Sequence, residues 1–419
     1  MSRGPTRARV VRFRLPSGDG RSAWGNADAS TKTSTLRTGF LLELRDRDGR
    51  SGWGEASPLA AYSGERPVEA ASGLLRLLGN GTAVEQLLEL LESPESMAWI
   101  GSPGDSPAAP LFDGLDDLLG HSASARSALI SALADLAGHR AGVPTHELHL
   151  PASELTAPVA AATLADSDVG PSKSACRINA LVPLTGRREA LASATDAYTR
   201  GIRVLKAKLG SGDQFDAELE LLQLLRGEMG DDLIFRLDAN GSWTLDEARV
   251  NLDRLAFLRP EYVEEAVAGA AMAELEESPV PLAADESLRD VEATKRLLDT
   301  PAISVLILKP SLLGGLDRCF DLGLRAIRSG RRCVVTHGFE GPVGHGAACE
   351  LALGLATFDS GGTEGRPLAQ GLDRRGVLDA WSDVAVPQLR GPFLVPADVS
   401  GHGIDPSALL ERAGGDGVI

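Results

Sequence analysis

The chain has 419 residues, which is enough for two domains or for one barrel with additions. Its 58 acidic against 42 basic residues give a net charge of -16, and this excess argues against a nucleic-acid groove or an anionic membrane surface as a partner. The hydrophobic content of 43% is that of an ordinary globular protein.

Cysteine usage and the N-terminus bear on the compartment. The four cysteines, Cys176, Cys319, Cys333 and Cys349, form no Cys-x-x-Cys pair and have no histidine at a spacing suited to zinc. The last three lie in apolar patterns, so we expect buried free thiols. The first 15 residues carry five arginines and no apolar core, and no apolar run approaches the ~20 residues that span a bilayer. These features predict a cytoplasmic protein.

Residues 9–56 have the pattern of a β-meander. Strand-like runs occur at Arg9–Phe13, Phe40–Leu44 and Ser51–Trp53, and Asp46-Arg47-Asp48-Gly49 supplies turn chemistry between the last two. The N-terminal part of the chain therefore begins with antiparallel strands.

Helical patterns follow these strands. They are expected at about 67–79 and 83–92, and residues 93–123, rich in Pro, Gly and Ser, are expected to form a long loop or insertion. A further helix is predicted over Ala125–Ala141, because apolar residues recur there at helical spacing and Gly142 with Pro144 ends it. Residues 151–174, dominated by Ala, Ser, Pro and Asp, are interpreted as a linker between domains.

After residue 174 the pattern alternates regularly between strand and helix. A capping box, Thr244-x-x-Glu247, opens the helix after the third strand. An eighth strand near 355–358 is only weakly indicated, and the last 50 or so residues look irregular. The seven clear strands are expected near 177–182, 203–209, 233–240, 261–266, 281–286, 303–309 and 332–337.

Two lysines share one side of the second of these strands. Side chains alternate along a strand, so Lys206 and Lys208 point to one side while Leu205, Ala207 and Leu209 point to the other. The alternative, a solvated edge strand, is disfavoured by the apolar opposite face and by the helices predicted on either side.

Charged residues recur at the ends of the following strands. Asp238, Glu264, Asp285 and Lys309 come at intervals of 30, 26, 21 and 24 residues, counted from Lys208. Each interval is about one strand plus one helix, which is the period of a (β/α) barrel. Because the carboxyl ends of parallel barrel strands meet at one mouth, three carboxylates and three lysines are expected to lie together there.

This set of side chains suits proton abstraction next to a carboxylate. Asp238, Glu264 and Asp285 are hard oxygen ligands of the kind Mg²⁺ prefers, although a lone Asp at a strand end is usually a turn or helix cap. Removing an α-proton creates an enediolate with two negative charges, which a divalent cation offsets. Neighbouring cations would lower the pKa of a lysine base toward neutrality. By alternation Arg236, Asp238 and Asn240 all face the mouth.

With these residues placed, the chain resembles the enolase superfamily, and within it the muconate-lactonising subgroup with Lys-x-Lys on the second barrel strand. The resemblance covers about residues 37–375. The matching stretches are Lys206-Ala207-Lys208, Asp238-Ala239-Asn240-Gly241, Glu264-Glu265, Asp285-Glu286-Ser287, Lys309-Pro310, Gly52-Trp53-Gly54-Glu55-Ala56-Ser57-Pro58-Leu59 and Ala132-Leu133-Ala134-Asp135-Leu136-Ala137-Gly138.

The resemblance implies an α/β fold, a (β/α)7β TIM-like barrel with an N-terminal α+β capping domain that the C-terminal segment completes. The implied division is 1–150 for the capping domain, 151–174 for the linker, 175–365 for the barrel and 366–419 for the C-terminal segment. It implies a Mg²⁺ cofactor, with Mn²⁺ as a substitute, and a small-molecule carboxylate as substrate. Monomer and homo-oligomer both stay open.

Residue roles also follow from the resemblance alone. Asp238, Glu264 and Asp285 would hold the metal, Lys208 would take the α-proton, and Lys309 would support the enediolate from the opposite face. Side chains and backbone expected to position the substrate are Lys206, Arg236, Asn240, His337 and Gly338. Two departures from the subgroup stand out: Ala266 replaces the usual Pro after the Glu-Glu pair, and His337 replaces a common Ser. A structural role for His337 is an equal alternative.

Within the subgroup the chain is most similar to the o-succinylbenzoate synthase family, through residues 308–315, 339–344 and 371–373. That similarity implies syn dehydration of a succinyl-hydroxycyclohexadiene carboxylate in menaquinone biosynthesis. An N-succinylamino acid racemase uses the same triad and both lysines and stays open as an alternative. The Asp-x-Asp expected of dipeptide epimerases is absent around 356–361. A non-catalytic barrel would have lost a ligand or a lysine, and none is lost.

Overall fold

Seven parallel strands form the larger part of the molecule, which a computed structural model describes for residues 7–16, 36–92, 112, 114–149, 175–359, 367–373, 388–396 and 399–412. The strands follow one another around the sheet in chain order, and each pairs in parallel with the next. Their bounds are β5 Ala180–Leu181, β6 Val204–Lys208, β7 Ile234–Asp238, β8 Tyr262–Glu264, β9 Leu282–Ala284, β10 Ile303–Leu308 and β11 Arg332–Val335.

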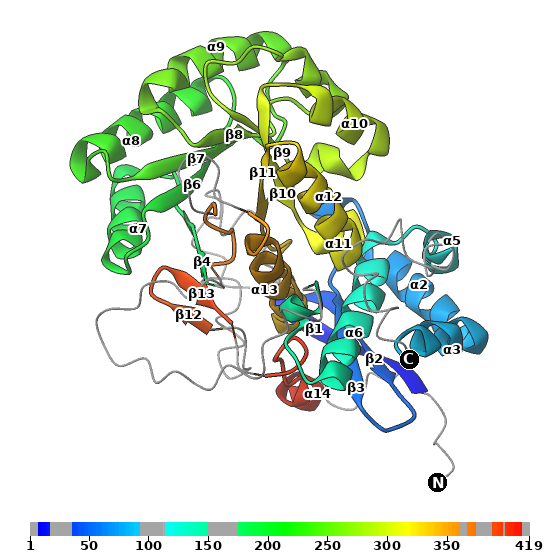
Figure 1. Cartoon of the computed structure of the whole chain (residues 1–419). Coiled ribbons are helices and arrows are strands. Elements are labelled where there is room, and N and C mark those ends of the chain that lie inside the picture. Colours follow the sequence, from blue (N-terminus) through cyan, green and yellow to red (C-terminus); the bar gives the residue numbers. More distant parts are fainter. Residues whose placement is uncertain are drawn as a thin grey trace.

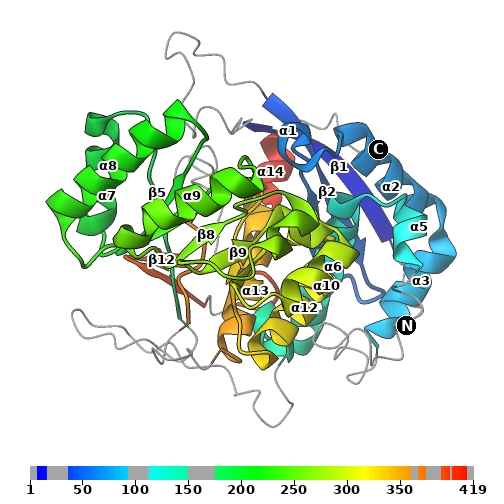
Figure 2. The same cartoon turned by 90° about the horizontal axis from the view of Figure 1, so that it is seen from above.

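Helices cover the outside of this sheet (Figure 2). The predicted capping box opens α9, where the Thr244 hydroxyl accepts from the Glu247 N–H and the Glu247 carboxylate accepts from the Thr244 N–H. In the described part of the chain, no helix combines the length and the apolar character needed to cross a bilayer. The helices are α7 Arg187–Thr199, α8 Asp213–Met229, α9 Leu245–Leu255, η4 Ala256–Leu258, η5 Gly269–Glu274, η6 Glu286–Arg289, α10 Val291–Asp299, α11 Pro310–Leu313, α12 Leu316–Arg328 and α13 Pro342–Ala356.

The ring is closed by residues 367–373 rather than by a strand near 355–358. Residues 355–356 end helix α13, so the predicted eighth strand is wrong; a run of Ala and Leu without β-branched residues favours a helix. Parallel bridges instead join Gln370 to Ile178 and Gly371 to Thr336. Gly371 N donates to the Val335 carbonyl at 2.8 Å. This confirms the expected TIM-like barrel, with its closing segment beyond the predicted boundary at 365.

The described residues before 150, here called the cap, form an antiparallel sheet packed on helices. The predicted meander is confirmed as β1 Arg7–Pro16, β2 Leu36–Arg45 and β3 Ser51–Ala56, in the order β1-β2-β3. In the predicted turn, Asp46 Oδ1 accepts from the Asp48 and Arg50 N–H groups. The helices are α1 Ala60–Ser63, α2 Pro67–Gly79, α3 Gly81–Leu90, α5 Leu115–Leu119, α6 Ala123–Ala141 and η3 Thr145–His149.

Helix α5 corrects one expectation. Residues 93–123 were predicted to be a loop or insertion, but Leu115–Leu119 is helical, with Leu115 and Leu119 buried and Gly120 ending the helix at φ 64°. Its short length hides the helical period in the sequence. The rest of that range up to residue 111, and the predicted linker 151–174, lie outside the described residues.

Helix α6 is the centre of the cap, and the glycines of β3 let it approach closely. A Cβ at Gly54 would lie 1.8 Å from the Ala128 carbonyl oxygen, and one at Gly52 would lie 2.2 Å from that of Ala132. Asp135 on the same helix accepts from the Trp53 N–H at 2.8 Å. The Gly-Trp-Gly motif is therefore a helix-packing motif in this fold.

The C-terminal residues return to both parts of the molecule. Strand β12 Gln388–Arg390 pairs with β13 Phe393–Val395, which pairs in turn with β4 Cys176–Arg177, ahead of the first barrel strand. The His402 N–H donates to Asp135 at 2.7 Å. Helix α14 Ser407–Arg412 lies beside the cap sheet (Figure 1), where Leu409 packs with Trp53 and Leu41.

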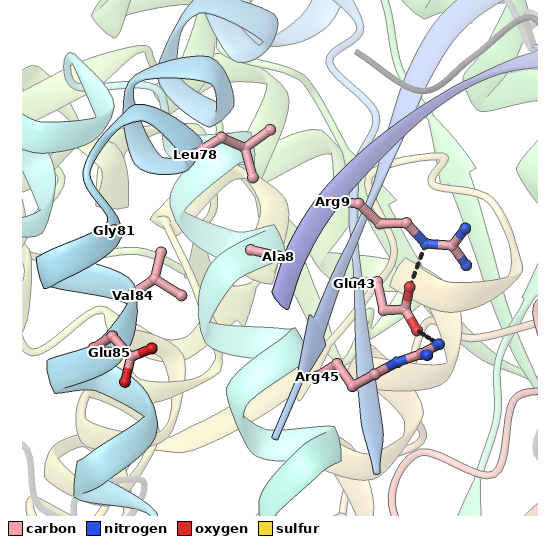
Figure 3. A pocket seen from close by; sticks show the side chains of 8 residues that line it. All are labelled: Ala8, Arg9, Glu43, Arg45, Leu78, Gly81, Val84 and Glu85. Carbon is pink, nitrogen blue, oxygen red and sulfur yellow. Dashed lines mark hydrogen bonds and ion pairs between the residues drawn. The ribbon is translucent and has the colours of Figure 1, made fainter. Parts of the chain in front are cut away.

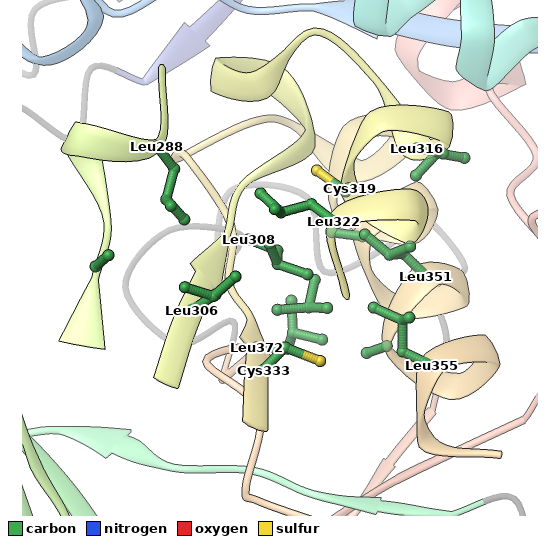
Figure 4. Packing of buried hydrophobic residues seen from close by; sticks show 14 of the residues in the cluster. Leu288, Leu306, Leu308, Leu316, Cys319, Leu322, Cys333, Leu351, Leu355 and Leu372 are labelled. Carbon is green, nitrogen blue, oxygen red and sulfur yellow. The ribbon is translucent and has the colours of Figure 1, made fainter. Parts of the chain in front are cut away.

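The apolar core runs continuously between strands and helices. Figure 4 shows Leu306 and Leu308 of β10 facing Leu316, Cys319 and Leu322 of α12. All four cysteines are buried thiols outside any disulfide, which confirms the expectation for Cys319, Cys333 and Cys349. Burial raises the pKa of the Cys176 and Cys333 thiols to about 12, so they are inert in this setting.

Candidate active site

The two lysines of β6 point into the mouth, which we define as the space at the carboxyl ends of β6 to β11. Leu205, Ala207 and Leu209 are buried on the other side, as predicted. Lys206 Nζ lies 2.9 Å from Asp238 Oδ2 and 2.6 Å from Glu264 Oε1. Burial opposes the charge on Lys206, but Asp238 and Glu264 outweigh it and raise the pKa of this lysine.

Lys208, two residues on, has a different setting. Its ammonium donates to the amide oxygen of Asn240 at 2.7 Å. Asn240 is held in turn by Asp238, whose Oδ1 accepts from the Asn240 side chain at 2.8 Å. Burial lowers the pKa of Lys208, and Asp238 opposes this. The positive charges of Lys206 and Lys309 add to the lowering, and the pKa lies below that of an ordinary lysine. This is the direction that a lysine base requires.

The three predicted carboxylates lie at the ends of neighbouring strands. Asp238 on β7 is the register partner of Glu264 on β8, and Asp285 follows β9. They are 3%, 1% and 3% exposed. Burial would raise the pKa of Asp238, but Lys206, Lys208 and Lys309 lower it to about 2. The structure thus brings together the carboxylates and lysines that the sequence predicts.

Lys309 follows β10 on the far side of the mouth. It is 5% exposed, and its ammonium is ion-paired with Asp285 and donates to the hydroxyl of Tyr62. Burial would lower the pKa of Lys309, but Asp285 and Glu286 raise it. The Asp285 carboxylate therefore stabilises Lys309 in its charged form, whereas Lys208 is hydrogen-bonded to a neutral amide.

Glu265 supports this constellation, and the sequence pattern gave it no role of its own. Its carboxylate accepts from the Asp285 N–H at 2.8 Å, the Ser287 N–H at 3.1 Å and the Ser287 hydroxyl. Its backbone has a φ of 44°, a left-handed conformation that is rare outside glycine. Burial raises the pKa of Glu265 to about 7. Glu265 thus fixes the chain that carries Asp285.

The donor set fits a divalent cation. Burial raises the pKa of Asp285, and the adjacent carboxylates of Glu286 and Glu264 add to this, so negative charge is crowded at this point. Among the described residues no three Asp, Glu, His or Cys side chains stand as a closed ligand shell, and the carboxylate oxygens contact ammonium groups instead. Three buried carboxylates are hard ligands suited to Mg²⁺.

Arg236 lies below the mouth with little room for a ligand. It is fully buried, its Nε donates to Glu261 at 2.6 Å, and one terminal nitrogen donates to Asn179 at 2.9 Å and to the Ala369 carbonyl. These contacts favour a supporting role that joins β7 to the closing segment. Contact of Arg236 with substrate stays a prediction.

His337 and Gly338 begin the segment after β11. The His337 ring is stacked edge-on to Phe339 at 5.4 Å between centroids, and burial lowers its pKa to about 4, helped by Lys309 and Lys206. His337 is therefore neutral. The Gly338 N–H donates to Glu340 at 2.7 Å, so it is already satisfied. Their proposed contacts with substrate stay predictions.

The cap contributes a side chain that sequence reasoning missed. Tyr62, from α1, reaches Lys309 and packs edge-on against Phe339 at 6.2 Å. It follows the recognised Gly-Trp-Gly-Glu motif by only a few residues, which is the one signal that could have indicated it. A cavity at the edge of the cap, lined by Ala8, Arg9, Glu43 and other residues (Figure 3), lies away from the mouth and holds none of the predicted residues.

Comparisons with known proteins agree with this geometry. The family described as Enolase C-terminal domain-like matches residues 189–408, more than half of the chain. The chain is 32% identical over 188 residues to an o-succinylbenzoate synthase of Thermobifida fusca, covering 44% of this chain and 57% of that protein. It is 30% identical over 152 residues to an L-amino acid-D/L-Glu epimerase of Francisella philomiragia, covering 35% and 43%.

The chain thus spans about half the length of these curated relatives. A solved structure, the muconate lactonizing enzyme from Pseudomonas putida, has a similar fold, with a TM-score of 0.69, 21% identity, and 99% of each chain covered. The family match covers the barrel strands that carry the carboxylates and both lysines. The chain therefore belongs to the Enolase C-terminal domain-like family.

Proposed function

We propose that this protein is an o-succinylbenzoate synthase. It would convert 2-succinyl-6-hydroxy-2,4-cyclohexadiene-1-carboxylate to o-succinylbenzoate by Mg²⁺-dependent syn dehydration, a step of menaquinone biosynthesis. The observation that supports it most is the unequal setting of the two lysines. Lys208 is bonded to a neutral amide, and Lys309 is ion-paired with Asp285.

In this proposal Lys208 carries out the proton transfers. Its neutral amine takes the proton from the carbon next to the substrate carboxylate, leaving an enediolate. The same ammonium then gives that proton to the departing hydroxyl, so the carbon–oxygen bond breaks and water leaves as the ring becomes aromatic. Mg²⁺ held by Asp238, Glu264 and Asp285 would supply positive charge next to the enediolate. Lys309 supplies a fixed positive charge from the opposite side.

The unequal lysines favour dehydration over racemisation. A racemase needs a base on each face of the substrate, so both lysines must pass between charged and neutral forms. In this structure Asp285 and Glu286 raise the pKa of Lys309, while burial lowers that of Lys208. One cycling base and one fixed cation are what a syn dehydration requires.

N-succinylamino acid racemase activity is the second candidate. It is favoured by the presence of Lys208 and Lys309 on the two sides of the mouth and by the 30% identity to an epimerase. It needs the same carboxylates and the same cation. A single protein with both activities is compatible with this site.

Direct assay decides between these activities. Purified protein with added Mg²⁺ is tested on the succinyl-hydroxycyclohexadiene carboxylate and on an N-succinylamino acid, with Lys208→Ala as the matched inactive control. We expect dehydration that depends on Lys208 and exceeds racemisation in kcat/KM. Racemisation with no dehydration would contradict the proposal.

A further inference from the structure

The segment after β11, His337–Gly341 and here called the β11 loop, joins the mouth to helix α13. It carries His337 and Phe339 toward the mouth, and Phe339 packs against Tyr62 of the cap. Its path is unusual, because Phe339 has a φ of 64°, in the left-handed region that side chains other than glycine rarely adopt. Such a conformation persists only when surrounding contacts hold it.

Two buried carboxylates supply those contacts, one from each part of the molecule. Glu340 belongs to the β11 loop itself. It accepts from the Gly338 N–H at 2.7 Å and from the hydroxyl of Ser311, two residues beyond Lys309. The barrel side of the loop is therefore tied to the chain that presents Lys309.

The second carboxylate, Glu55, comes from strand β3 of the cap. It is 2% exposed and accepts from the N–H groups of Gly341 and Gly344, at the start of α13, and from the hydroxyl of Ser57. A Cβ at Gly344 would lie 2.6 Å from the Glu340 Cβ, so the two carboxylate side chains crowd the same glycine. Figure 1 shows α13 between the barrel and the cap strands.

One cation of the cap faces these carboxylates. Two carboxylates approach each other, and Arg37 of β2 faces both of them. Arg37 is anchored by a bond of 2.7 Å to the Ser57 carbonyl, next to Glu55. Cap and barrel thus meet through buried polar groups, in which each acceptor has defined donors.

We propose that Glu55 is a positioning residue of the active site: from the cap, it fixes the start of α13 and so sets the β11 loop and, through Glu340 and Ser311, the end of β10 that carries Lys309. It does not touch the reacting atoms. Only the kinetic part of this inference depends on the proposed function, because the contacts with the loop exist whatever the substrate.

The test replaces Glu55 by Gln, which keeps the size and removes one acceptor. Glu43→Gln is the matched control: Glu43 is 3% exposed on the same sheet, but its partners Arg9, Arg45 and Ser51 all belong to the cap. The measurement is amide hydrogen exchange of residues 338–344 in full-length protein, alongside thermal unfolding and kinetics.

We expect Glu55→Gln to speed exchange over 338–344 by about tenfold or more, because the Gly341 and Gly344 N–H groups lose one of the two carboxylate oxygens that accept from them. Glu43→Gln should lower the melting temperature and leave that exchange unchanged. In the dehydratase assay kcat should fall about tenfold in Glu55→Gln alone, with KM changed less. Ser57→Ala, a milder change, should speed the same exchange by a smaller factor and serves if Glu55→Gln does not fold.

Equal exchange over 338–344 in the Glu55→Gln and Glu43→Gln proteins would overturn the proposal, as would unchanged exchange in Ser57→Ala when Glu55→Gln is unfolded. Absence of dehydratase activity in the wild type would contradict the proposed function. It would leave the exchange result to decide this inference by itself.

Discussion

The two sides of the mouth are built differently. On the Lys309 side the cap reaches the barrel: the Tyr62 hydroxyl accepts a hydrogen bond from Lys309, which is 5% exposed and ion-paired with Asp285. On the Lys208 side the lysine is half-buried and bonded to Asn240, a residue of the barrel itself. The Lys309 side is held by a barrel carboxylate and a hydroxyl of the cap, and the Lys208 side by a neutral amide that follows the neighbouring strand.

This difference shows how two lysines in one active site can have different chemical roles. Both lysines are amines beside carboxylates, but Lys309 is ion-paired with Asp285, whereas the Lys208 ammonium donates to the amide oxygen of Asn240. An ammonium next to a buried carboxylate keeps its proton, while one desolvated among cations releases it more easily. The following predictions test that contrast, from the largest effect to the smallest.

Removing a carboxylate shared by both sides should have the largest effect. Asp238 contacts Lys206 and holds Asn240, which in turn holds Lys208. We expect Asp238→Asn to reduce Mg²⁺-dependent activity to background while the fold survives, as measured by a Mg²⁺ titration of activity and by circular dichroism. Asp246→Asn, at an exposed carboxylate on α9, is the control and should be fully active. Full activity of Asp238→Asn would refute the metal assignment.

Removing each lysine in turn should separate their duties. Lys208→Ala should stop exchange of the substrate α-proton with solvent and lower kcat by about 10²–10⁴ fold, the usual contribution of a general base. Lys309→Ala should impair dehydration even where substrate still binds. Proton exchange is followed by NMR in deuterated water, and small, equal losses in both variants would show that the two lysines do not differ in duty.

The cap side should respond to the loss of one hydroxyl. Tyr62→Phe removes the acceptor of the Lys309 ammonium but keeps the ring against Phe339. Hydrogen bonds to charged groups predict a fall in kcat of about tenfold. Tyr198→Phe, on α7 at the opposite edge of the barrel, is the matched control and should have no effect. Kinetics of both variants on one substrate check this, and equal activities would mean that the cap does not act through Lys309.

The pH profile should report the Lys208 side. Burial lowers the pKa of Lys208, and a base acts only when neutral, so kcat/KM should rise with pH through a value below that of an ordinary lysine. The value of kcat/KM rises with pH because Lys208 is protonated at lower pH and cannot then act as a base. A profile measured at saturating Mg²⁺ tests this. A kcat/KM that falls with rising pH over the same range would show that Lys208 is not the base.

Much of the barrel was predictable from the sequence, because its signals are local and repeated. Strand alternation placed Lys206 and Lys208 on one face, and the recurring interval placed Asp238, Glu264 and Asp285 at one mouth. The closing segment was missed because Gln370 and Gly371 make isolated bridges with no strand pattern of their own.

Contacts between distant segments were harder to predict. Tyr62 and Lys309 are separated by 247 residues, and nothing in the local pattern of either indicates the other. Arg236 looked like a substrate ligand because alternation points it inward. Strand alternation does not show how deeply a side chain is buried. The partners of Arg236 come from three other segments and are Glu261, Asn179 and Ala369. The role of Glu265 was missed because its partners, Asp285 and Ser287, follow the next strand, about 20 residues further along the chain.

The contrast between the two lysines is tested most directly by Lys309→Arg, assayed for both activities on one purified, folded variant. Arginine keeps a cation beside Asp285 but cannot serve as a base, because guanidinium does not lose its proton in proteins. Lys208→Arg is the matched control and should lose both activities. We predict that Lys309→Arg retains part of the dehydratase activity and loses any N-succinylamino acid racemase activity to background. Racemisation that survives while dehydration vanishes would contradict the account.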